Sequence, residues 1–167
     1  MEKIKIGGIM QSDGRALVKI MSVPDHVSVA ATVLGVMGEK GINIELLAES
    51  FDLDECGNFS LIIDQKDLDY AVDALEEIKA TIDAKVVSYT PDVAVITIFG
   101  PHLREKPLVH SMMFSCIASA GISSLAISTS ISSVSCVVKG QHLNTAIQAL
   151  SDGFDAPFKV KERPKDY

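Results

Sequence analysis

Residues 67–75 read DLDYAVDAL, and residues 142–150 read HLNTAIQAL. Both stretches place two leucines and two alanines at the spacing of one face of an α-helix. Upstream, Gly41-Ile42 recurs 80 residues later as Gly121-Ile122, whereas the offset between the two helical stretches is 75 residues. Blocks that recur in the same order indicate two copies of one module, with a connection five residues shorter in the second copy.

The first copy predicts the order β-α-β-β-α-β. Alternating and β-branched stretches predict the strands, and apolar residues three and four positions apart predict the helices. Gly41 is expected to end the first helix in the left-handed conformation, and Pro91 to end the last strand. The predicted strands are 17–23, 42–49, 59–63 and 85–89, and the predicted helices cover residues 29–37 and 68–78.

The second copy repeats this order but leaves its closing strand open. Its predicted strands are 93–99, 123–128 and 134–138, and its predicted helices are 107–120 and 143–150. Residues 158–160 could close the sheet, and so could the N-terminal stretch 4–10, while the charged residues 161–167 predict a frayed tail. The predicted fold class is α+β, with two ferredoxin-like modules whose antiparallel sheets carry helices on one face.

Composition excludes several classes of protein. With 167 residues and 47% hydrophobic residues, the chain can build packed cores. A net charge of −7 without a basic block argues against nucleic acid or an anionic membrane as a partner. No apolar run reaches membrane-spanning length, and three widely spaced cysteines are typical of reduced thiols. These features predict a cytoplasmic protein.

Three functions found on ferredoxin-like folds lack their signatures here. RNA-recognition modules carry aromatic residues on the central strands, which here read FSLII (59–63) and VSCVV (134–138). A metal carrier needs paired cysteines in the first loop, where only His26 could bind a metal ion. An acylphosphatase needs an arginine cradle, for which Arg104 is the one candidate. We therefore expect no catalytic residue, no metal and no cofactor.

The start of the first helix suits a free α-amino acid. A helix N-terminus offers unpaired N–H groups and partial positive charge to a carboxylate, and a nearby acid suits the ammonium group. Asp25 stands just before this helix, and Glu105 has the matching place in the second copy. The other candidate residues of the first site are His26, Val27, Ser28, Val29, Asn43, Glu49, Ser50 and Asn58. Those of the second site are Leu108, Ile122, Ser128, Thr129 and Ser130.

Simpler roles stay open for these residues. Asp25 could complement the helix dipole, and Ser28 could be a helix cap. Asn43 could tolerate the backbone that follows the helix, and Glu49 with Ser50 could be polar residues of an edge strand. His110, in the second helix repeat, could cap a partly exposed face.

Four segments carry a resemblance to a known family. These are GIMQ at 8–11 with ALVKI at 16–20, SVPD at 22–25, EKGINI at 39–44, and ISTS at 127–130 after Gly121-Ile122. Over roughly residues 8–155 the chain resembles the tandem ACT-domain regulatory region of aspartokinases. The resemblance implies modules that bind feedback amino acids such as lysine or threonine and form homodimers whose sheets join side by side. It also implies a first module at 15–92 and a second at 93–158, completed by a strand within 3–12 and followed by a tail at 159–167.

The chain departs from this family in ways that bear on function. The family usually has Pro-Gly at the helix start, where this chain has Val27-Ser28 and Pro107-Leu108. The small Ser28 leaves room for a ligand in the first module, whereas Leu108 adds bulk in the second. Glu49-Ser50 replaces a Gln-Asn pair, and Ile131 stands where an acidic residue is common. No phosphate-binding glycine loop is present, so we expect a regulatory module that is not an enzyme and that is either an orphan module or acts on a separate kinase chain. The alternative is a ligand-free dimerisation scaffold.

Overall fold

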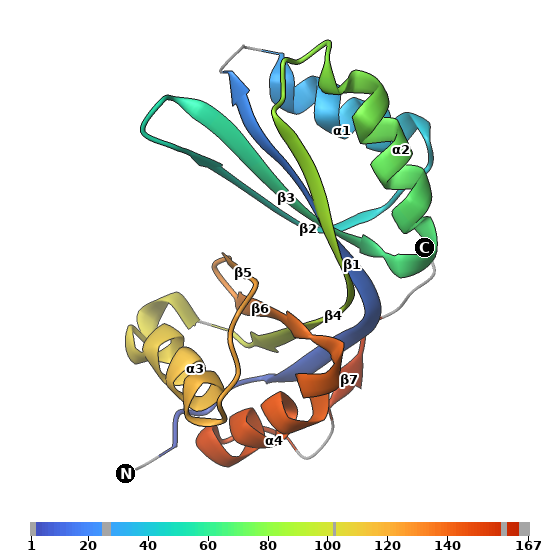
Figure 1. Cartoon of the computed structure of the whole chain (residues 1–167). Coiled ribbons are helices and arrows are strands. Elements are labelled where there is room, and N and C mark those ends of the chain that lie inside the picture. Colours follow the sequence, from blue (N-terminus) through green and yellow to red (C-terminus); the bar gives the residue numbers. More distant parts are fainter. Residues whose placement is uncertain (1–2, 25–27, 102, 158–159, 164–167) are drawn as a thin grey trace. The chain divides into compact units, whose positions relative to one another are not determined.

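Two compact units make up the chain (Figure 1). The computed structural model describes residues 3–24, 28–101, 103–157 and 160–163. One unit is Gly14–Asp92, which we call the inserted unit; the other combines Met1–Asp13 with Val93–Tyr167, which we call the split unit. Strands β1 (Gly8–Pro24) and β4 (Val86–Phe99) each contribute residues to both units.

The inserted unit has the strand order β2-β3-β1-β4. Strand β3 is antiparallel to both of its neighbours, β1 and β2. Helices α1 and α2 cover one face of this sheet (Figure 1). The elements beside β1 and β4 are α1 (Val29–Glu39), β2 (Ile44–Phe51), β3 (Cys56–Asp64), the short η1 (Gln65–Asp67) and α2 (Leu68–Lys79).

The split unit has the strand order β1-β4-β6-β5, and β7 pairs with β1 in parallel. Its elements beside β1 and β4 are η2 (Leu103–Glu105), α3 (Leu108–Ser119), β5 (Ala126–Thr129), β6 (Ser133–Lys139), η3 (Gly140–His142), α4 (Leu143–Gly153) and β7 (Lys161–Glu162). The predicted α+β class, with helices on one face of antiparallel sheets, is therefore confirmed.

Strand alternation and helix periodicity build each core. In the inserted unit, Phe59, Leu61 and Ile63 of β3 point to one face, because successive strand residues alternate between faces. They meet the buried stripes of α1 (Val29, Val33, Met37) and α2 (Leu68, Ala71, Ala74, Leu75). In the split unit the corresponding stripes are Val109, Met113 and Ile117 of α3 and Leu143, Ala146 and Leu150 of α4.

Two glycines end helices as predicted. Gly41 has φ +68° and Gly121 has φ +72°, a conformation that L-residues with a Cβ adopt at a cost. Both follow the first helix of their unit, and each is succeeded by a buried isoleucine, Ile42 or Ile122. The glycine thus turns the chain so that the next residue enters the core.

The prediction that Pro91 ends a strand is wrong. Strand β4 runs through it from Val86 to Phe99, and Asp92 takes φ 52°. In the inserted unit β4 lies at the end of the strand order, so a missing N–H on its outer side breaks no ladder bond. Gln65 supports this bend, since its Oε1 accepts from the Asp92 N–H at 2.6 Å and its Nε2 donates to Asp92 Oδ1 at 3.0 Å.

The predicted frayed tail is wrong for residues 161–163. Lys161 and Glu162 form β7 opposite Met10 and Gln11, and the Arg163 N–H donates to the Gln11 carbonyl at 2.8 Å. The charged composition of this segment hid the strand, because the pairing uses backbone groups that composition does not reveal. Residues 158–159 and 164–167 lie outside the described residues.

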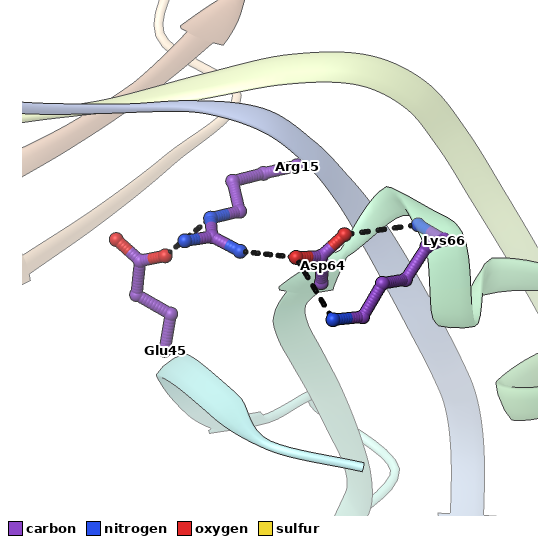
Figure 2. Close-up of polar contacts among 4 residues, drawn as sticks. All are labelled: Arg15, Glu45, Asp64 and Lys66. Atoms are coloured by element: carbon purple, nitrogen blue, oxygen red, sulfur yellow. Dashed lines mark hydrogen bonds and ion pairs between the residues drawn. The ribbon is translucent and has the colours of Figure 1, made fainter. Parts of the chain in front are cut away.

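A buried ion cluster joins three strands of the inserted unit (Figure 2). Arg15 of β1 is 6% exposed; its Nε lies 2.6 Å from Glu45 Oε2 of β2, and its Nη1 lies 3.1 Å from Asp64 Oδ2 of β3. The register of β2 against β3 shifts between Ile44 and Leu46, which is where Glu45 stands. A bulge of this kind re-aims one side chain. The cluster therefore ties the edge strand β2 to β1 across β3.

Replacing Arg15 by leucine should destabilise the protein by about 3–5 kcal/mol, because the nearly buried Glu45 carboxylate and the partly buried Asp64 carboxylate would lose the guanidinium group that lies between them. Urea unfolding followed by circular dichroism measures this change. Lys66→Ala is the matched control, since Lys66 Nζ lies 3.8 Å from the same Asp64 but its side chain is 72% exposed. It should cost about 1 kcal/mol or less. Equal losses for both variants would contradict the assignment.

Candidate functional site

The candidate site of the inserted unit lies at the end of the sheet where β1 and β2 finish and β3 begins. Pro24 of β1 pairs with Cys56, and Ser50 of β2 pairs with Asn58. Helix α1 begins at Val29, after the loop that follows this end of β1. Asp25, His26 and Val27 fall in that loop and lie outside the described residues.

The start of α1 offers backbone groups rather than side chains. Ser28 is exposed at the N-cap position, its side chain makes no capping hydrogen bond, and its carbonyl accepts from Thr32 N at 2.9 Å and from Thr32 Oγ1 at 3.0 Å. Val29 is 6% exposed and packs into the core, so only its backbone faces the loop side. The described first turn holds no acidic residue that would offset the partial positive charge of the helix N-terminus.

Strand β2 sends its two candidates to opposite faces. Glu49 pairs with Phe59, whose side chain is in the core under α1, so Glu49 lies on the helix-covered side. Ser50 pairs with Asn58 on the other side. Both β2 residues are exposed. The structure thus groups Glu49 with the start of α1 and separates Ser50 and Asn58 from it.

Asn58 is engaged by backbone. Its Oδ1 accepts from the Ser22 N–H at 3.0 Å, and its Nδ2 donates to the Cys56 carbonyl at 3.5 Å. Ser22 has φ 55° and stands in the irregular stretch of β1 between Ile20 and Val23. Asn58 therefore supports the bend that directs β1 toward the candidate loop.

Asn43 is not brought to this end of the sheet. It follows the C-terminus of α1, and the 11 residues of that helix span about 16 Å. Asn43 is exposed there, just before β2 begins at Ile44. It cannot contact a small ligand seated at the start of α1.

The split unit shows a polar contact that the sequence did not reveal. His110 Nε2 lies 3.0 Å from Thr129 Oγ1, joining the first turn of α3 to the edge strand β5. Thr129 has the same place in the repeat as Glu49, 80 residues earlier. The signal for this contact in the sequence was that His110 falls in the first turn of the predicted helix 107–120.

The remaining candidates of the second site spread over both faces. Ser128 pairs with Ser135, whose Oγ lies 2.8 Å from Thr97 Oγ1, on the face away from the helices. Ser130 Oγ lies 2.8 Å from Ser133 Oγ in the turn that follows β5. Ile122 is buried in the core, whereas Glu105 and Leu108 are exposed before and at the start of α3. At 65% exposure, Leu108 presents an apolar side chain where the inserted unit has Ser28.

Two cysteines of the split unit, Cys116 and Cys136, have thiols of raised pKa. Burial raises the pKa of the Cys136 thiol to about 11, partly offset by its hydrogen bond with Ser124, and burial also raises the pKa of Cys116. A thiol reacts as thiolate, so these two are protonated and inert near neutral pH. Among the described residues, no three His, Cys, Asp or Glu side chains gather as a metal site.

Comparisons with known proteins agree with this architecture. Residues 96–154, within the split unit, match the family described as ACT domain. An aspartate kinase of Stutzerimonas stutzeri is 30% identical over 159 residues, covering 94% of this chain and 39% of the relative. An aspartokinase of Pseudomonas aeruginosa is 29% identical, covering 97% of this chain and 40% of the relative.

Solved structures share the fold. The regulatory subunit of aspartate kinase from Thermus thermophilus, in ligand-free form, superposes with a TM-score of 0.82 at 24% identity, covering 90% of this chain and 99% of that one. Aspartate kinase from Synechocystis gives a TM-score of 0.85 at 23% identity, covering 100% of this chain and 29% of that one.

The chain is similar to the ACT-domain regulatory region of aspartokinases. It spans about 40% of the length of the aspartokinases that it matches. The inserted unit lies outside residues 96–154. Its strand order β2-β3-β1-β4 corresponds to the order β5-β6-β4-β1 of the split unit. None of the described helices is long and apolar enough to cross a membrane.

Proposed function

We propose that the chain is a regulatory module that binds a free amino acid in the inserted unit, at the end of β1 and the start of α1. The observation that carries this proposal is the open N-terminus of α1, with Ser28 exposed and Glu49 on the same side of the sheet. First-turn N–H groups suit the ligand carboxylate. Asp25 or Glu49 suits the ammonium group, since each is acidic and close in sequence or register to that helix start.

Lysine and threonine are the effectors to test first. The family resemblance implies feedback amino acids, and a structure of E. coli aspartokinase III, which shares the fold at a TM-score of 0.69, was solved with lysine and aspartate. We also propose a cytoplasmic location, because free amino acids and their biosynthetic enzymes are found there.

We propose that the module is not itself catalytic and acts on a separate kinase chain. A structure described as aspartokinase alpha and beta subunits contains a chain of which the present one covers 97%, at 23% identity. In this proposal, regulation passes from the effector site to the catalytic groups of the separate kinase chain. Contact with a partner chain is therefore part of the proposal.

We propose a homodimer joined along a sheet edge. Leu47 of β2 and Ile127 of β5 have equivalent places in the two repeats, face the helix side and are 40% and 48% exposed. Residues 29–38 and 108–119 in the adjacent helices contain no Asp, Glu, Lys or Arg. The exposed residues there are the apolar Leu108 and a set of small residues, namely Ala31, Gly35, Gly38, Ser111, Ser115, Ala118 and Ser119. A helix without charges on its outer face is typical of a buried helix, so these faces suit a second copy.

An effector that binds only the folded protein should raise its stability by about 2.7 kcal/mol at a hundredfold excess over Kd. Thermal unfolding with millimolar lysine, threonine and the other free amino acids measures this. Asp25→Asn and Glu49→Gln should each weaken binding about tenfold by removing a charged contact to the ammonium group. Glu39→Gln, at the far end of α1, is the control and should bind normally. If no amino acid raises the melting temperature, effector binding is excluded and the scaffold alternative stands.

The dimer should dissociate when a charge is placed on the sheet edge, because the buried ammonium group would have no partner. Leu47→Lys and Ile127→Lys test the two edges by sedimentation velocity. The control is Tyr70→Lys on α2, a side chain of 56% exposure that belongs to a helix and not to an edge strand. A wild-type monomer, or dimers that survive both edge substitutions, would refute this assembly.

A further inference from the structure

A cavity lies in the split unit, where α4 ends. Its volume is about 310 Å³, at the lower limit of small-molecule pockets. The lining residues are Lys3, Ser151, Phe154, Asp155, Ala156, Pro157 and Val160. None of them belongs to either candidate site predicted from the sequence.

Backbone hydrogen bonds join two of the chain segments that line the cavity. The Asp155 N–H donates to the Ile4 carbonyl at 3.0 Å, and the Ile6 N–H donates to the Asp155 carbonyl at 2.9 Å. Lys3 directly precedes this pairing, so Lys3 and Asp155 stand on adjacent, mutually bonded segments. Phe154, 1% exposed, closes the helix through its N–H to the Leu150 carbonyl at 2.9 Å. The wall is therefore part of the packed unit.

The charges of the cavity are of opposite sign. Lys3 and Asp155 both line it, and within the described residues neither side chain forms an ion pair. The last carbonyls of α4 add partial negative charge on the side of Asp155. Phe154, Ala156 and Val160 are apolar residues of the same lining. A ligand that satisfies all of them has a carboxylate, an ammonium group and an apolar body.

We propose that this cavity binds a small zwitterion with an apolar side chain, such as a free aliphatic amino acid. Its carboxylate meets the Lys3 ammonium, and its own ammonium meets Asp155 and the C-terminus of α4. The apolar side chain packs on Phe154 and Val160. This site is separate from the effector site proposed for the inserted unit and does not depend on it.

Amide NMR spectra of the full chain test the chemistry with three probes of the same carbon skeleton. L-leucine carries both charges, isovalerate only the carboxylate and isopentylamine only the ammonium. Leucine should give saturable shifts at Phe154, Asp155, Ala156 and Val160, and each single-charge probe should bind at least about tenfold more weakly. Leucine shifts absent up to about 50 mM, or equal binding of one single-charge probe, would overturn the proposal.

Substitutions locate the site. Lys3→Gln and Asp155→Asn should each weaken leucine binding about tenfold. The matched controls are Lys139→Gln on β6 and Asp152→Asn, whose carboxylate accepts from Gln148 Nε2 at 3.0 Å and does not line the cavity. If a variant unfolds, NMR binding of the three probes to the wild-type chain still tests the proposal. Leucine shifts confined to residues 28–58 would refute this cavity as a site while leaving the effector site of the inserted unit intact.

Discussion

The hydrogen bonding of β1 constrains the whole chain. Its residues from Arg15 onward pair with β3 in the inserted unit, while its first residues and the preceding Ile6 belong to the split unit. Ile6 and Ile9 are 4% and 2% exposed in the core beneath α3 and α4. In the strand order of the split unit, β1 is followed by β4, β6 and β5, which come from the residues from Val93 onward. The second repeat in the sequence is therefore completed in space by the beginning of the chain.

Much of this arrangement follows from sequence periodicity. The leucine and alanine stripes of residues 68–75 and 143–150 predict α2 and α4 because apolar burial dominates their placement. Gly41 and Gly121 mark the ends of α1 and α3, because glycine adopts a positive φ at low cost. A glycine at such a position can be recognised directly in the sequence. The predictions for Pro91 and for residues 161–163 were wrong because strand pairing there depends on which backbone N–H groups need partners. That need is set by neighbouring strands distant in sequence.

The candidate site shows a similar division. The sequence points to the helix start after β1 as the candidate site, and strand register decides which polar residues can share it. Register places Glu49 on the side of α1 and sends Ser50 to the face of Asn58, which is occupied with Ser22. In the split unit, His110 bonds Thr129 at the matching place. The two units thus use one scaffold with different polar groups, which agrees with the effector site proposed for the inserted unit and the separate site proposed for the cavity at the end of α4.

Hydrogen–deuterium exchange on a chain shortened by residues 1–12 tests the interlocked architecture most directly. Without Ile6 and Ile9 the split unit loses part of its core and the pairing of β7. Amides of β4 after Val93 and of β6 should then lose protection, while those of β3 in the inserted unit keep it. Unchanged protection in β6 would show that the N-terminal segment is dispensable and that residues 93–167 form a module by themselves.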